Sequence, residues 1–519
     1  GWIQVGMNPY RHSWFYDKRD GRPIDSFSDL IQIGPLVLAK DTVKIDPSDS
    51  RFSFKGDRDN EVKYQGNLVS DTKEKTVQGV RIGQGRASRV IKGERVVEPG
   101  SFDGTLDVSI SGLREKDQEA YIANAAYLAQ MDMVRAVKKF QERVFSGKNA
   151  LAAADEVYKI FVDEVADNLV FLHDQFNEQL RDIATLWYDG ANIISQELST
   201  RYDMSVEQVS AVIAALSPQK DWYQNLRLAE LVIDFMKTVG PDLIITQDLV
   251  DFHEEGGKKW AKDLQQYVGQ PFSSITKGSD AAAILWAYAD LNMGKEYHIV
   301  SPDGKRGELA TKQDGSPKKA AWGSRSMIAA AMDAVSAVGS MAFSEILGNQ
   351  HKIRNFFNNI ANPGHGSDAT IDTHAVAAAH LKPFAGSSAE VIINLGGSKV
   401  FVGKDGAMYS LEQVKKMAKT SSAPKANAYA AKKGMKVVNV KSKQGLGLSG
   451  MYYAYLDAYR KAAEARGVLP REMQSITWEA VRLLYTASFK QSSKNKSDIE
   501  ALHRKYTNGE LTQEQLRAE

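Results

Sequence analysis

The sequence predicts a mainly α-helical fold with a β-rich N-terminal region and two insertions into a helical core. Three patterns support this prediction. Residues 1–113 contain short apolar or alternating runs separated by Gly, Asp and Pro clusters, which is typical of strands joined by turns. From Arg114 onward the apolar residues recur with helical spacing. Two segments, residues 297–322 and 398–447, interrupt that helical spacing.

The predicted domain organisation follows these changes along the chain. The expected parts, in order, are a β-rich region (1–113), a helical connector (114–180), a helical core (181–397) with a hairpin or loop inserted at 297–322, a lysine-rich insertion with two short β-like runs (398–447), closing helices of the core (448–490), and a charged, peripheral C-terminal tail (491–519). No internal repeat is visible.

Local chemistry marks the boundaries of two predicted helices. Ser205 and Gln208 form a capping-box signature ahead of an apolar stripe that runs to Leu216. Near the C-terminus, Tyr452, Tyr455, Leu456 and Tyr459 share one helix face. Gly467 follows as a helix stop.

Composition excludes several classes of protein. The chain of 519 residues is 43% hydrophobic and 25% charged, as in ordinary globular proteins. Its formal net charge of +2 gives no whole-protein attraction to nucleic acid. The absence of cysteine excludes disulfides, iron–sulfur clusters and thiolate zinc sites. No apolar run approaches the roughly 20 residues of a membrane span, and residues 1–21 lack the features of a signal peptide.

The stretch from Asn349 to His380 contains the most informative polar residues. Lys352 begins an expected helix whose apolar positions 353, 356, 357 and 360 have helical spacing. A lysine at a helix N-terminus opposes the helix dipole, so it does not stabilise this helix. Two interpretations stay open: a solvated surface lysine, or an amine held close to an anion or an electrophile.

Asp372 follows Lys352 by 20 positions and opens a second, alanine-rich helix. If a hairpin brings the two helices together, Lys352 and Asp372 face one cleft. The alternative is that Asp372 and Thr373 are N-cap residues and that His374 is a polar filler or a core histidine.

Three motifs occur in one order along the core: residues 216–219 (Leu-Ser-Pro-Gln), 347–352 (Leu-Gly-Asn-Gln-His-Lys) and 371–374 (Ile-Asp-Thr-His). They resemble the DNA-facing segment, the glycine hairpin with its lysine, and the aspartate element of helix-hairpin-helix DNA glycosylases of the endonuclease III kind. The resemblance covers about residues 180–395, with 448–490 as closing helices. The chain also resembles an uncharacterised group of phage-encoded proteins with ALSPQ, KIRNFF, TIDTHA and Gln-x-Ile-Thr-Trp motifs.

The resemblance implies roles in base chemistry on DNA. Asp372 would be the catalytic carboxylate, Lys352 an amine nucleophile at the sugar C1′, and His374 a group that orients Asp372. The target base would be flipped out of the duplex. The implied DNA contacts are Ser217, Gln219, Trp222, Asn225, Gly348, Asn349 and Gln350. Core packing is the alternative for Gln219 and Trp222, and Trp478 is expected in the core.

The chain departs from the family in three respects, of which the first is that the two insertions enlarge the core. Gln350 replaces the second glycine of the hairpin, which in the family approaches a DNA phosphate, and the cysteine cluster of some members is absent. Histidines and aspartates crowd residues 351–380, but no ligand spacing such as H-E-x-x-H occurs, so neither a metal site nor a cofactor is expected. The basic runs AKKGMKVVNVKSK (431–443) and SFKQSSKNK (488–496) are either phosphate contacts or solvated loops.

The sequence therefore predicts an enzyme that acts on a flipped-out DNA base, most simply an N-glycosylase with or without AP-lyase activity. One alternative is a phage enzyme of base hypermodification that transfers an amine to an activated thymine derivative. The other is a non-catalytic DNA-binding or virion-associated protein. DNA is the expected partner and no membrane is expected. The cytoplasm, or the host cytoplasm for a phage protein, is the expected location, and the oligomeric state stays open.

Overall fold

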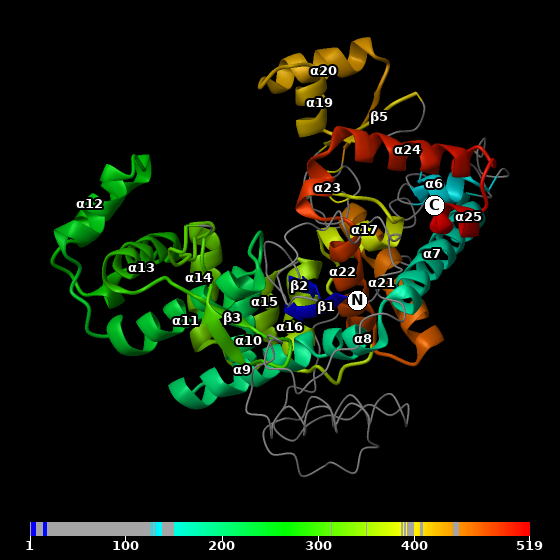
Figure 1. The fold of residues 1–519 in the computed structure, drawn as a ribbon. Helices are drawn as coiled ribbons and strands as arrows, with labels where there is room; N and C mark the ends of the chain where they lie inside the picture. The colour runs from blue at the N-terminus through cyan, green and yellow to red at the C-terminus, as the bar shows by residue number, and fades with distance from the viewer. Residues whose placement is uncertain are drawn as a thin grey trace, which may run out of the picture. The chain divides into compact units, whose positions relative to one another are not determined.

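The computed structural model describes residues 2–6, 14–17, 125, 128–129, 131–137, 150–312, 314–348, 350–385, 388, 391, 399–404, 408–439 and 446–519. These residues are mainly helical (Figure 1), and none of their helices has the length and apolarity to cross a membrane. The chain divides into two compact units. Unit one takes the described residues within 1–46, 107–185 and 366–519, and unit two takes those within 186–365. The predicted core, residues 181–397, therefore spans parts of both units.

Strands occur near the start of the described chain. Strand β1 (Trp2–Gly6) pairs antiparallel with β2 (Trp14–Asp17). The rest of the predicted β-rich region, residues 18–113, lies outside the described residues, so a β-rich N-terminus stays a prediction.

Unit two is built around helix α10 (Val206–Leu216), which packs against α9, α11, α14 and α16. The predicted capping box is confirmed: the Ser205 hydroxyl accepts from the Gln208 amide, and the Gln208 side chain accepts from the Ser205 amide. The other elements of the unit are α9 (Trp187–Tyr202), α11 (Trp222–Asp234), the π-helical segment η4 (Phe235–Val239), α12 (Gln247–Glu255), the 3-10 segments η5 (Lys259–Tyr267) and η6 (Phe272–Ser274), α13 (Gly278–Asn292), β3 (His298–Val300), β4 (Arg306–Leu309), α14 (Arg325–Ser336), α15 (Gly339–Leu347) and α16 (His351–Ala361).

The hairpin predicted within residues 297–322 is confirmed. Strands β3 and β4 pair antiparallel, and the turn between them packs on α9. A Cβ atom at Gly190 would lie 2.1 Å from the carbonyl oxygen of Pro302, so only glycine allows this approach. The hairpin is therefore fixed to the helical core of unit two by backbone contact.

Unit one surrounds the short helix α17 (Thr373–His380), which packs against α7 and α22. The other elements of the unit, besides β1 and β2, are α6 (Asp132–Arg135), α7 (Ala150–Gln175), α8 (Glu178–Ala184), β5 (Lys399–Val402), β6 (Met408–Ser410), α19 (Leu411–Met417), α20 (Ala423–Lys432), β7 (Lys436–Asn439), α21 (Leu446–Arg466), α22 (Pro470–Leu484), α23 (Ala487–Gln491), α24 (Ser493–Thr507) and α25 (Gln513–Ala518).

Three tyrosines of α21 bind α17 and the segment before it. The Tyr452 hydroxyl accepts from the amide of Ile371 and donates to the carbonyl of Ala369, both at 3.0 Å. Tyr459 donates to the carbonyl of Ala375 at 3.1 Å, and the Tyr455 hydroxyl bonds to Nε2 of His380. The predicted shared face of α21 is thus confirmed, because all three rings are buried. Gly467, with φ +65°, ends the helix as expected.

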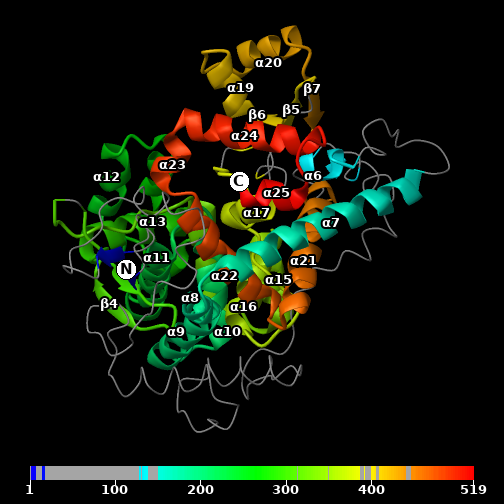
Figure 2. The same cartoon turned by 45° about the vertical axis from the view of Figure 1, so that its right-hand side comes forward.

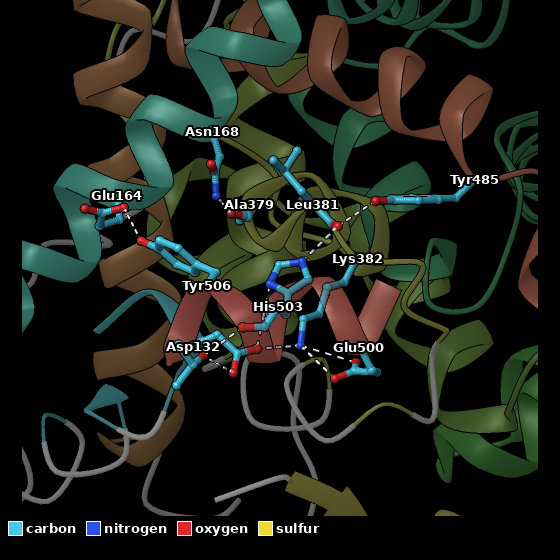
Figure 3. Close-up of polar contacts among 11 residues, drawn as sticks. Asp132, Glu164, Asn168, Ala379, Leu381, Lys382, Tyr485, Glu500, His503 and Tyr506 are labelled. Atoms are coloured by element: carbon cyan, nitrogen blue, oxygen red, sulfur yellow. Dashed lines mark hydrogen bonds and ion pairs between the residues drawn. The ribbon is translucent and has the colours of Figure 1, made fainter. Parts of the chain in front are cut away.

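The C-terminal end of α17 is held by a polar network (Figure 3). Leu381 adopts a left-handed conformation, and its carbonyl accepts from the Tyr485 hydroxyl at 2.5 Å and faces Nε2 of His503 at 3.4 Å. Lys382 is only 5% exposed, and its ammonium bonds to Asp132 at 2.6 Å and to Glu500 at 3.2 Å. Helices α6, α22 and α24 therefore all meet the end of α17.

Lys382 supplies the positive charge of this network. Burial raises the pKa of Asp132, but the charges of Lys382 and His503, together with hydrogen bonds from Lys382 and Thr507, bring the pKa down to about 2. Burial lowers the pKa of His503 to about 3, so this imidazole is neutral at pH 7. The ion pair with the buried Lys382 is therefore the strongest of the contacts that keep the half-buried Asp132 carboxylate ionised.

Two parts of the chain pack into unit one more fully than the sequence predicted. Residues 491–519 are not a peripheral tail, because α24 and α25 bury His503, Tyr506 and Leu516 within unit one. The predicted connector 114–180 contains α7, which packs along α21 as part of the same core (Figure 2). The charged sequence of residues 491–519 suggested exposure, but charged side chains on one helix face leave the other face free to be buried.

Replacement of Lys382 by Met should destabilise the protein by about 2 kcal/mol, because the half-buried Asp132 would lose its charge-assisted hydrogen bond from a buried ammonium. Urea unfolding at pH 7 measures this loss. The matched control is Lys461→Met, which removes an ion pair with Asp163 whose side chains are 49% and 40% exposed. The control should cost less than about 1 kcal/mol. Equal losses in the two variants would show that the Lys382 pair does not hold α17.

Candidate functional site

Asp372 caps the N-terminus of α17. Its Oδ1 accepts from the backbone amides of His374 and Ala375 at 3.0 and 2.8 Å. The helix behind it is buried, yet a quarter of the Asp372 side chain is exposed. The N-cap role weighed for Asp372 is thus confirmed, and it leaves a carboxylate fixed at the accessible end of an otherwise buried helix.

His374 lies beside Asp372. Its Nδ1 is 3.6 Å from Oδ2 of Asp372, which is within ion-pairing range but longer than a hydrogen bond. Burial lowers the pKa of His374, and the negative charge of Asp372 only partly opposes this. His374 is therefore a neutral imidazole at pH 7 that can take up or pass on a proton next to the carboxylate.

Trp478 of α22 packs edge-on against the ring of His374. The two rings are 5.7 Å apart and inclined at 75°. The guanidinium carbon of Arg482 lies 3.8 Å from the centre of the Trp478 ring. The expectation that Trp478 belongs to the core is wrong in part: its neighbours Thr477 and Glu479 are buried, whereas Trp478 is half-buried. The side chain turns to the edge of the unit, where it meets α17.

Lys490 of α23 is a site residue that the sequence motifs missed. Burial lowers the pKa of its amine to about 8, Arg482 acts in the same direction, and Asp372 opposes them. About one amine in ten is then neutral, and hence nucleophilic, at pH 7. The basic run SFKQSSKNK contains three lysines with nothing in the local pattern to single out one of them. Only the packing of α23 distinguishes Lys490.

The predicted hairpin in unit two is a pair of helices joined by a short turn. Helix α15 ends before Gly348, whose φ of +58° favours glycine, and α16 begins at His351. Arg354 donates to the carbonyls of Ser344 and Gly348, which fastens α16 to the end of α15. Gln350 is the exposed N-cap of α16 and makes no side-chain capping bond there. Asn349 lies outside the described residues.

Lys352 is half-buried in the first turn of α16. It belongs to unit two, whereas Asp372 belongs to unit one. The expectation that these two side chains face one cleft therefore stays a prediction. Within unit one, the groups that come together are Asp372, His374, Trp478, Arg482 and Lys490.

The residues expected along the DNA-facing segment differ in exposure. Gln219 is exposed and has φ +60°, a backbone conformation that costs energy for a side chain of this kind. Trp222 is half-buried and packs edge-on against Phe356 at 6.3 Å. Such strain at an exposed position is characteristic of functional loops.

The other two residues of that segment are buried. Asn225 is 2% exposed and donates to the carbonyl of Ile213 at 3.0 Å, so its role is to join α11 to α10. Ser217 is 6% exposed at the end of α10. The predicted DNA contacts of Asn225 and Ser217 are therefore not supported, because tertiary packing covers both side chains.

Metal ligation was weighed for the histidines and aspartates of residues 351–380. Across the described ranges, no group of three or more His, Cys, Asp or Glu side chains is placed to hold a metal ion. His380 is 3% exposed and bonds to Tyr455, so it acts in packing.

A family of unknown function (DUF7178) matches residues 152–244 and 424–483. The matched segments contain Gln219 and Trp478 but neither Lys352 nor Asp372. No curated protein and no solved structure matches the chain. None of these comparisons assigns an activity, so a function can be proposed only from the residues and their geometry.

Lys490 should react with an amine acylating reagent with half-maximal rate near pH 8, because burial favours its neutral form. Brief acetylation pulses at several pH values, read by peptide mass spectrometry, measure this. Asp372→Asn should move the midpoint to lower pH, since Asp372 is the group that raises the pKa of Lys490. The exposed Lys494 provides the reference in the same digest. An unchanged midpoint in the Asn variant would separate Lys490 from the Asp372 cluster.

Proposed function

We propose that this protein is an enzyme that acts on a flipped-out base in DNA, most simply as an N-glycosylase. The observation that carries the proposal is the Asp372 carboxylate, fixed by two backbone amides and partly exposed beside Trp478 and His374. The motif resemblance and the hairpin of α15 and α16 support the same class of activity. A DNA substrate implies action in the cytoplasm, or in the host cytoplasm for a phage protein.

The negative charge of the Asp372 carboxylate can stabilise the transition state of base release. As the bond between the base and C1′ lengthens, positive charge develops on the sugar, and a fixed negative charge nearby stabilises that state. Asp372 does not need to reorganise, because the helix amides already hold its Oδ1. The adjacent imidazole of His374 can exchange a proton with the attacking water or the leaving base.

The neighbouring aromatic and basic groups suit a nucleotide. Trp478 presents a partly exposed ring on which a base can stack. Lys490 provides positive charge next to Asp372, whereas Arg482 is buried, pairs with Glu479 and covers one part of the Trp478 ring. An extruded nucleotide carries a flat base and a negatively charged phosphate, and the cluster offers a partner for each.

Two amines are candidates for a lyase step. Lys352 is the residue implied by the motif resemblance, and Lys490 is the amine whose pKa is lowered to about 8 in the Asp372 cluster. In either case the neutral amine forms a bond to C1′ as the base departs with the electron pair of the glycosidic bond and takes up a proton. Ring opening then gives an imine. A base removes a proton from C2′, the 3′ phosphate leaves with the electron pair of the C3′–O bond, and water hydrolyses the imine to release the amine.

Asp372→Asn should abolish base release while DNA binding stays within about twofold. Asn caps a helix as well as Asp does, so the fold should be kept, and a carboxylate that acts in the transition state affects rate rather than binding. Single-turnover assays on duplexes with uracil, oxidised or hypermodified bases should show a loss of about 100-fold or more. Asp498→Asn, at an exposed ion pair on α24, is the control with the same change of charge. Equal activity of all three proteins would favour the non-catalytic binding protein.

Borohydride should trap a covalent adduct between the protein and DNA if an amine attacks C1′. The adduct should disappear in the variant that lacks the attacking amine, Lys352→Gln or Lys490→Gln, and persist in the other variant and in Lys494→Gln. Denaturing electrophoresis and peptide mapping identify the site. Base release without an adduct would indicate a glycosylase without lyase activity. A mass change on a base whose bond to the sugar stays intact would instead indicate base modification.

A further inference from the structure

Within residues 399–439, hereafter the lysine module, the described residues 399–404 and 408–439 form a small fold with its own core. Strands β6, β5 and β7 lie in that order in an antiparallel sheet, with Phe401 opposite Tyr409 and Val437. Helices α19 and α20 lie against this sheet (Figure 2) and pack on Phe401. The buried residues of this core are Phe401, Val414, Ala426 and Ala430. The lysine-rich insertion is therefore a defined fold rather than a solvated loop.

The described residues of the lysine module carry a strong positive charge. In the sequence, residues 399–439 contain nine lysines, no arginine, one aspartate and one glutamate, which gives a net charge of +7. The whole chain has a net charge of only +2, so the remainder carries −5. The near-neutral total hides a marked separation of charge between this module and the rest of the protein.

Most of these charges are not neutralised within the module. Glu412 pairs with Lys415 at 2.7 Å. The lysines at positions 416, 419, 425, 432 and 433 are exposed, and none of them forms an ion pair with another described residue. Like charges gathered on so small a fold repel one another, and a polyanionic partner would relieve that repulsion.

The details of the surface favour one kind of polyanion. Lysine without arginine provides point charges for phosphates but not the forked donors that identify bases. Tyr409 and Tyr429 pack half-buried against the module's core, which limits the ring area on which single-stranded bases could stack. Only Met417 (39%) and Val437 (49%) are large, exposed apolar residues in the described part of the module, too few to insert into a lipid surface.

We propose that the lysine module is an accessory surface that binds the phosphate backbone of duplex nucleic acid without regard to sequence. It does not depend on the chemistry proposed for Asp372. Such a surface would keep the protein on DNA between encounters with a target base and raise the effective concentration of the substrate.

The test compares two triple variants of the full chain with the same change of charge. Lys425→Gln/Lys432→Gln/Lys433→Gln neutralises exposed positions of α20 and the residue that follows it, and Gln preserves helix propensity. Lys258→Gln/Lys259→Gln/Lys262→Gln neutralises three exposed lysines of unit two as the control. Affinity for a random duplex of about 30 base pairs is measured by fluorescence anisotropy over a range of KCl concentrations.

The α20 variant should lose about tenfold or more in affinity at physiological salt, and the slope of log K against log salt should flatten by about 2.7, or 0.9 for each lost phosphate contact. The control should keep the wild-type slope. Equal slopes in all three proteins would overturn the proposal. So would binding of an acidic peptide or of phosphatidylserine vesicles that depends on these lysines while duplex binding does not.

The result is independent of catalysis. If the α20 variant changes the salt slope but no protein releases a base from any substrate, the accessory surface stands and the glycosylase proposal fails. If bases are released and the slope is unchanged, the opposite holds.

Discussion

Helix α17 imposes the central constraint on unit one. Its buried residues are mostly alanine, so its own side chains cannot form hydrogen bonds with the free backbone amides and carbonyls at its two ends. Asp372 accepts from the first amides, and the left-handed Leu381 with the buried Lys382 closes the other end. Each end therefore needs polar partners, and helices far apart in sequence provide those at the C-terminus. The same constraint creates the candidate site, since the capping carboxylate must stand where the helix reaches the surface.

Charge in this protein is organised locally rather than globally. Lysine is buried and paired at position 382, half-buried with a lowered pKa at position 490, and exposed without an ion pair to another described residue at five positions of the lysine module. These three environments give the same side chain three different properties: a structural ion pair, a reactive amine and a diffuse positive surface. A net charge of +2 conveys none of this, which is why composition alone argued against an electrostatic interaction with nucleic acid.

The amino-acid sequence by itself determined the helices and their ends. The capping box before α10, the apolar stripe of α16, the tyrosine face of α21 and the stop at Gly467 all follow from residues within a few positions of one another. Asp372 as a helix cap belongs to the same group. Such features depend on local hydrogen bonds and on the period of the helix, so they can be predicted without knowledge of the fold.

The tertiary structure alone decided which polar side chains are available for chemistry. Asn225 lies in a DNA-facing motif but is covered by packing, whereas Trp478 is turned toward His374. Lys490 differs from the other lysines of its run only through burial near Asp372 and Arg482. Exposure and pKa depend on groups brought together from distant positions in the chain, and a sequence pattern gives the period of a helix but not its neighbours.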